Sequence, residues 1–501
     1  MSPPRRRSNS PMSPNSRPTT ISPRWSGCWR RKTPPIATER DVSGGLRLDG
    51  REAVALTRLA LPIIMARIGL TLMLVVDNMI VGHFGTGALA GFSLGLVLVQ
   101  TMQTIGLGLL LGGMVEISAA YGRGATEECG RIWRRSLLYA LVIGAGAVAV
   151  ADRAEGIFLA LGQDPALAAE AAWVAAVIGW SLPPMLCYIA SIGLLEATGR
   201  PYVGVVLLAA ANLINLGLNL LLVHGALGLP ALGAEGSALA TLAARLALAG
   251  GTLFYILRLM PERRSLGRGR WSDHGWRAGR RQRRLGYAEG MSMGIESGSF
   301  ALLTVFAGQI GAVQLAAYTI AVNINMMLFM LAVGVGGAAA VRVAQARGRH
   351  DGGAMARSGA TGLAVFSLLM LGVALLFLAV PGAVTALYTG DPALAAATAP
   401  IVALIGFVAW IDGAQRVIAN ILRGYGEAWA PTTSHLVSYV AVMVPAAWAL
   451  SLPLGLGALG LILAIALASV VATGLLLARF RYLAARPLLI PREQEITWAS
   501  S

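Results

Sequence analysis

Three acidic residues interrupt long apolar segments of this chain: Asp77, Glu296 and Asp412. A charged side chain near a bilayer centre costs roughly 2.5–3.5 kcal/mol on insertion scales, so such residues often mark ion or substrate pathways. A carboxylate of this kind could instead only cap or pair with a neighbouring helix. The sequence around Asp77 does not decide between these two interpretations.

Three amides share one helical face in the segment 201–223. Asn212, Asn215 and Asn219 are three and four residues apart. Such amides can simply hold helices together, at about 0.6 kcal/mol each. If their face turns toward the first apolar segment, however, Asp77 gains oxygen neighbours. A carboxylate with amide oxygens suits a hard cation such as Na⁺, whereas a desolvated carboxylate can take a proton instead. The ligand types alone do not separate Na⁺ from H⁺.

The acids of the second half differ in their local partners. Asp412 and Arg416 are four residues apart, which makes an ion pair within one helix a strong alternative to a functional role. Glu296 has no basic residue within a helical turn and is therefore a stronger candidate for a functional role than Asp412. Gln415 and Asn420 extend the polar surface beside Asp412.

Two residues in the segment of Asp77 complicate its interpretation. Arg67 lies ten residues before Asp77, near mid-membrane, where it could neutralise an acid of another helix. Pro62 removes a backbone hydrogen bond and should bend the helix. We hypothesise that this bend links ion binding to helix shape. Glu116 and Glu196 fall at the ends of apolar segments, where solvation is the expected explanation.

The composition predicts an all-α membrane protein. Of 501 residues, 56% are hydrophobic and 13% are charged, against about 25% charged in an average soluble domain. No stretch alternates in the way that a β-barrel requires. We expect twelve transmembrane helices of about 20 residues. Their predicted ranges are 54–80, 88–116, 134–152, 168–195, 201–223, 235–257, 287–309, 316–338, 359–380, 396–422, 432–451 and 458–480.

Arginines gather in the loops after even-numbered helices, and Arg153 is the one exception. The positive-inside rule therefore predicts that both termini are cytoplasmic and that the chain lies in the cell (inner or plasma) membrane. Most of the net charge of +16 comes from residues 1–45 and 258–284, with +7 and +8. Because both tracts adjoin the membrane, anionic lipid head groups are the expected partner, not nucleic acid.

The sequence contains an internal repeat, in which the second half matches the first at a shift of 226–227 residues. Gly85–Ala90 matches Gly311–Ala316, and Gln163–Ala169 matches Gly390–Ala396. Asp164 and Asp391 can cap helices that begin at the following prolines. Six helices in each half predict a parallel internal repeat of two six-helix bundles, with a substrate cavity between them. The repeat partners of the three buried acids are Leu303, Leu70 and Met185, so each half carries its own polar residues.

These features divide the chain into five parts. We expect a disordered basic cytoplasmic tail (1–50), an N-terminal lobe (51–258), an Arg-rich cytoplasmic linker (259–286), a C-terminal lobe (287–483) and a cytoplasmic tail (484–501). The three cysteines, Cys28, Cys129 and Cys187, are too scattered for a disulfide framework or a metal pair, and we expect no cofactor.

At these residues the chain resembles the multidrug and toxic compound extrusion (MATE) family, in its NorM-like branch. The similar segments are Val76–Gly82, Gly199–Pro201, Asn215–Asn219, Leu232–Thr241, Glu296 with Gly311–Asn325, and Asp412–Arg416 with Leu422–Gly426. The likeness covers about 50–485. It implies an antiporter in which H⁺ or Na⁺ enters as a cationic or amphipathic compound leaves.

The resemblance also implies roles for single residues. Asp77 would bind the coupling ion with help from Asn215, Asn219 and Thr241, and a Na⁺ ion would lie on Asp77, Asn215 and Asn219. Glu296 and Asp412 would form a second site, and Pro62 matches the bend position of the first helix. Arg67 departs from the pattern of the family.

Two functions other than export share some of these features. A flippase for a lipid-linked oligosaccharide or a related amphipathic lipid would share the architecture but needs a basic cavity, for which Arg67, Arg245 and Arg416 are the candidates. An intramembrane enzyme would need a nucleophile–base set or metal ligands, and the histidines have no such spacing. We therefore expect no enzyme, and a monomer whose partners are small molecules and the bilayer. The sequence does not identify the exported compounds.

Overall fold

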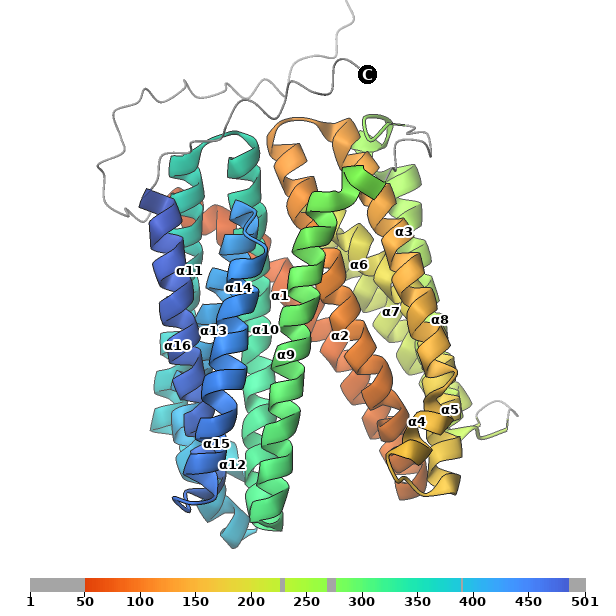
Figure 1. Ribbon diagram of the computed structural model, residues 1–501. Helices are drawn as coiled ribbons and strands as arrows, with labels where there is room; N and C mark the ends of the chain where they lie inside the picture. The colour runs from red at the N-terminus through yellow and green to blue at the C-terminus, as the bar shows by residue number, and fades with distance from the viewer. Residues whose placement is uncertain (1–49, 226–229, 268–275, 389–390, 486–501) are drawn as a thin grey trace, which may run out of the picture. The chain divides into compact units, whose positions relative to one another are not determined.

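The described residues of the computed structural model, 50–225, 230–267, 276–388 and 391–485, form helices joined by turns, with no β-strand among them (Figure 1). These described residues belong to one compact unit. The expectations for the N-terminal tail, for the linker part 268–275 and for the C-terminal tail from residue 486 lie outside the described residues.

The first half folds into the helices α1 to α8, followed by the short helices η2 and η3. Their bounds are α1 (Gly50–Phe84), α2 (Thr86–Gly122), α3 (Thr126–Ala151), α4 (Ala154–Ala160), α5 (Pro165–Trp180), α6 (Leu182–Ala197), α7 (Pro201–Leu222), α8 (Gly233–Phe254), η2 (Tyr255–Leu259) and η3 (Pro261–Arg264). The cap predicted for α5 is confirmed, because the Asp164 carboxylate accepts hydrogen bonds from the backbone N–H groups of Ala166 and Leu167.

The second half begins with the short helix η5 and continues from α9 to α16. Their bounds are η5 (Trp276–Gly279), α9 (Arg280–Ile310), α10 (Ala312–Gly348), α11 (Gly352–Ala379), α12 (Pro381–Ala386), α13 (Pro392–Tyr425), α14 (Trp429–His435), η6 (Leu436–Met443), α15 (Val444–Ser451) and α16 (Gly457–Ala485). The segment α14–η6–α15 forms one continuous span in which the middle is a π-helix.

Within the described residues, eleven helical segments are long and apolar enough to cross a membrane. Helices α5 and α6 count together as one of them, and α14 to α15 as another. Helix α9 is not among the eleven, although its 31 residues cover the predicted segment 287–309. It begins with arginines and carries Glu289 and Glu296, which makes it the least apolar of the long helices. With α9 included, the described chain has the twelve long helical segments that the sequence predicts.

The internal repeat is visible in the backbone. Helices α2 and α10 each have 37 residues and begin 226 residues apart. Positive φ angles recur at the same shift, at Gly124 (77°) and His350 (57°), and again at Gly199 (76°) and Gly426 (93°) at a shift of 227. A strained conformation at a non-glycine residue such as His350 is uncommon, so its match to Gly124 supports the repeat strongly.

The two halves also contact each other symmetrically. A Cβ atom built on Gly122 would lie 2.1 Å from the Gln345 carbonyl oxygen, and one built on Gly348 would lie 2.0 Å from that of Ala119. The two contacts are related by the shift of 226 residues. Glycine at both helix ends therefore lets α2 and α10 approach backbone to backbone. The expectation of two repeated bundles in an all-α membrane fold is confirmed.

Helix α1 packs against both bundles. Its first half contributes Leu56, Ala60 and Ile63 to an apolar cluster with α10 and α13. Its second half contributes Ala66 and Met73 to a cluster with α6, α7 and α8. Helix α9 of the second half packs beside α2 of the first half, just as α1 packs beside α10 (Figure 1). The first long helix of each half thus connects the two bundles.

The α2–α9 contact yields a stability prediction. A Cβ atom on Gly112 would lie 2.0 Å from the Gln282 carbonyl oxygen, so Gly112→Ala must push α9 away from α2. We expect a loss of about 1–3 kcal/mol in the free energy of unfolding, measured by denaturation in detergent. Gly146→Ala on α3 is the matched control, because no atom lies within 4 Å of its Cβ position. Equal stability of the two variants would contradict the close approach.

Candidate ion and substrate sites

Asp77 lies in a polar site between α1, α7 and α8, here called the N-terminal acid site (Asp77, Asn215, Asn219 and Thr241). Its side chain is buried, with the residue 3% exposed. Asn219 Nδ2 donates to Asp77 Oδ1 at 2.8 Å, and Thr241 Oγ1 donates to Asp77 Oδ2 at 2.8 Å. Asn215 Nδ2 donates in turn to Thr241 Oγ1 at 3.4 Å. The structure therefore brings these four predicted residues together.

The face of α7 that carries the three asparagines lies against α1 and α8. Asn212 and Asn219 donate hydrogen bonds to residues of α1, and Asn215 donates to Thr241 of α8. Asn212 Nδ2 donates to the Gly69 carbonyl oxygen at 3.1 Å and fixes α7 against α1. Three buried oxygens of α7 and α8 have no hydrogen-bond partner, namely Asn212 Oδ1, Asn219 Oδ1 and Ser237 Oγ. Such oxygens beside a carboxylate fit a small hard cation, and they fit a protonated acid equally well.

Asp412 lies in a second polar site, the C-terminal acid site (Asp412, Asn325, Gln415 and Ser469). The residue is 2% exposed. Ser469 Oγ donates to Asp412 Oδ1 at 2.9 Å, and Gln415 Nε2 donates to the same oxygen at 3.3 Å. Asn325 Nδ2 donates to Oδ2 at 3.4 Å. As at Asp77, hydroxyl and amide groups surround both carboxylate oxygens.

The alternative of an Asp412–Arg416 ion pair is wrong, because Arg416 pairs with two glutamates of α9. It contacts Glu289 at 3.2 Å and also pairs with Glu296. Glu289 pairs further with Arg423, whose side chain is 0% exposed. We call these four residues the buried ion network. Glu296, which lacked a local partner in the sequence, obtains its partner from another helix.

Sequence reasoning missed Glu289 and Arg423, although a signal for them exists. Glu289 and Glu296 are seven residues apart on α9, and Arg416 and Arg423 are seven residues apart on α13. Seven residues make about two helical turns, so two acids on one face meet two arginines on another. Equal spacing on two helices would have predicted the network.

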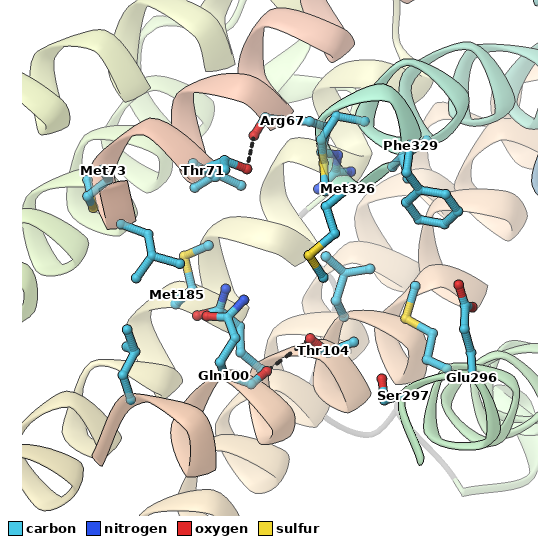
Figure 2. A pocket seen from close by; sticks show the side chains of 18 of the residues that line it. Arg67, Thr71, Met73, Gln100, Thr104, Met185, Glu296, Ser297, Met326 and Phe329 are labelled. Atoms are coloured by element: carbon cyan, nitrogen blue, oxygen red, sulfur yellow. Dashed lines mark hydrogen bonds between the residues drawn. The ribbon is translucent and has the colours of Figure 1, made fainter. Parts of the chain in front are cut away.

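Both acid sites face one cavity of about 360 Å³ between the bundles. Its walls come from α1, α2, α5, α6, α8, α9, α10 and α13. Figure 2 shows Glu296 and Ser297 on one side of this space and Gln100 and Thr104 on another. Apolar and polarizable side chains also line it, namely Phe92, Met293, Phe300, Met326, Phe329 and Met330. Asp77, Thr241, Glu296 and Asp412 line the cavity directly, whereas Asn215 and Asn219 lie behind Asp77.

The remaining predicted residues have mixed outcomes. Pro62 is buried inside α1, which is helical without interruption, and its bend stays a prediction. Solvation does not explain Glu196, which is 2% exposed. Glu116 accepts a hydrogen bond from Arg347 at 2.8 Å and pairs with Arg281 at 3.3 Å, so it connects the bundles. Within the part of the chain that the structure describes, no three His, Cys, Asp or Glu side chains are grouped to hold a metal ion.

Comparison with known proteins agrees with this architecture. The sequence profile of the MatE family matches residues 62–221 and 290–448, one segment in each half. A protein of Caulobacter vibrioides described as a probable multidrug resistance protein NorM is 37% identical over 452 residues, covering 89% of this chain and 96% of the relative. A protein of the same description from Bradyrhizobium diazoefficiens is 32% identical over 443 residues, covering 87% and 94%.

Solved structures share the fold at low sequence identity. The crystal structure of the eukaryotic MATE transporter AtDTX14 matches with a TM-score of 0.79 at 18% identity, covering 87% of this chain and 97% of that one. An outward-facing MATE family transporter matches with a TM-score of 0.78 at 18% identity, covering 86% and 96%.

The repeated bundles and the cavity between them define a multi-pass helical membrane protein that shares the fold of these structures. Because the matched profile covers both halves and the relatives match along most of their length, the chain belongs to the MatE family.

Proposed function

We propose that the chain is a secondary active antiporter. It exports cationic or amphipathic compounds across the cell membrane in exchange for H⁺ or Na⁺. The observation that carries this proposal is one cavity between two repeated bundles, lined by two separate buried acid sites. The description of the relatives as multidrug resistance proteins supports export as the direction of transport.

The acid sites supply the coupling to an ion gradient. Each carboxylate is surrounded by hydroxyl and amide groups that can also accommodate a bound H⁺ or Na⁺. Ion and exported compound stabilise opposite conformations, so each lowers the affinity for the other through reciprocal coupling. Expelling a monovalent cation against ~100 mV costs about 2.3 kcal/mol, and one entering ion returns the same amount. Two acid sites allow a second ion in each cycle.

Helix α1 transmits ion binding to the arrangement of the bundles. It carries Asp77 in its second half, while Leu56 and Ile63 in its first half pack against the other bundle. A change in α1 at the N-terminal acid site therefore acts on both bundles. The contacts at the ends of α2 and α10, among them the Glu116–Arg347 pair, are those that must part when the bundles rock.

Transport in vesicles tests the proposal. The purified full chain is reconstituted into liposomes loaded with ethidium, and an inward gradient of either H⁺ or Na⁺ is imposed. We expect one of the two gradients to drive dye release, and we expect release to stop when nigericin or monensin collapses that gradient. Protein-free liposomes are the control. Dye release at the same rate with and without each of the two gradients would refute antiport.

A further inference from the structure

The charged residues that line the cavity balance one another. Three acids, Asp77, Glu296 and Asp412, face three arginines, Arg67, Arg245 and Arg416. A cavity built only for cations would carry an excess of negative charge. This lining is formally neutral when the acids are ionised and becomes positive as they are protonated. This combination of acids and arginines complements a compound that carries both a positive and a negative charge.

Arg67 differs from the other two arginines of the cavity. Arg416 pairs with two glutamates, and Arg245 donates to Ser181 Oγ at 2.9 Å beside Asp77. None of the ion pairs among the described residues includes Arg67, and its buried Nε has no hydrogen-bond partner. The buried carboxyl of Glu196 on α6 is near enough to interact electrostatically with Arg67, but it forms no ion pair with Arg67 within 4.0 Å.

The surroundings of Arg67 favour a polar group of a ligand. Gln103 Oε1 is likewise buried without a partner, and Gln100 lies on the same helix and lines the same space. Met326 of α10 supplies an apolar surface beside Arg67 (Figure 2), whereas Phe329 packs under the guanidinium group of Arg416 at 5.1 Å. A guanidinium group in such a setting binds a carboxylate with two parallel hydrogen bonds.

We propose that Arg67 binds the carboxylate of a zwitterionic amphipath, whose cationic part faces the acids of the cavity. This inference rests on the proposed export function. It assigns a specificity role to a cavity arginine that the ion pairs among the described residues leave without a partner.

A matched pair of dyes isolates the carboxylate. Rhodamine 110 is a zwitterion with a free carboxylate, and rhodamine 123 is its cationic methyl ester. Binding of each dye to the purified full chain in detergent is measured by fluorescence polarisation, in wild type, Arg67→Gln, Arg67→Lys and Arg58→Gln. Arg58 is exposed on the same helix and does not line the cavity, so its variant is the matched control.

We expect Arg67→Gln to raise the Kd for rhodamine 110 about tenfold or more, because a hydrogen-bonded charge partner is lost. The Kd for rhodamine 123 should stay unchanged or fall, since a positive charge leaves the cavity. Arg67→Lys should retain part of the affinity for rhodamine 110, and Arg58→Gln should bind both dyes as wild type does. A fall in affinity of equal size for both dyes would assign Arg67 a structural role and overturn the inference.

The same dyes separate this inference from the proposed function. Wild type that releases rhodamine 123 from liposomes under an ion gradient, but does not bind rhodamine 110, would refute only the role of Arg67. Wild type that neither binds nor transports either dye would overturn the inference and count against the proposed export as well.

Discussion

Asp77→Asn is expected to reduce gradient-driven dye export to about one-hundredth of the wild-type rate or less. The substitution keeps the size of the side chain but removes the group that can take up a proton or pair with Na⁺. Asn219 and Thr241 both donate to Asp77, so an amide in its place also loses the strength of charge-assisted hydrogen bonds. The rate is measured as initial release of ethidium from liposomes under the gradient that drives wild type.

Two controls make this result specific. Asp152→Asn changes an exposed aspartate at the end of α3 and should leave the export rate unchanged. Binding of rhodamine 123 to Asp77→Asn should persist, because Glu296 and Asp412 still line the cavity. A variant that binds dye and exports it at the wild-type rate would show that Asp77 is not the coupling site.

The sequence predicts the N-terminal acid site well because its signals are local. Asn215 and Asn219 share a helical face by spacing alone, and burial of Asp77 makes a polar partner for it obligatory. The repeat could also be read directly, since matching glycines mark the same turns in both halves. The positive φ of His350, in contrast, follows only from its match to Gly124 at the repeat shift, because positive φ angles are uncommon outside glycine.

The buried ion network is harder to predict because its pairing is tertiary. Asp412 and Arg416 are suitably spaced on one helix, yet Arg416 instead meets two glutamates of α9. A surface pair at this spacing is worth only about 0.3–0.5 kcal/mol, whereas a buried arginine needs full compensation of its charge. The spacing of four residues therefore does not decide the pairing of Arg416, because the packing of α9 supplies it with stronger acid partners. The burial of Glu196 is not predictable from local sequence either, since burial at a helix end depends on neighbouring helices.

The buried ion network yields the second large prediction. Glu289→Gln is expected to lower the free energy of unfolding by about 3–5 kcal/mol, because removal of one member leaves buried charge without compensation. Arg423 would keep no acid partner among the described ion pairs, and its side chain is 0% exposed. The measurement is equilibrium unfolding in mixed detergent micelles, followed by tryptophan fluorescence.

Glu427→Gln is the matched control for this prediction, because Glu427 pairs with Arg479 nearer the surface. The side chains of that pair are 27% and 40% exposed, and such pairs contribute at most about 1 kcal/mol. The double variant Glu289→Gln with Arg423→Gln should be more stable than Glu289→Gln alone, since the orphaned charge is removed as well. If Glu289→Gln costs no more than Glu427→Gln, the four charges do not form one compensated network.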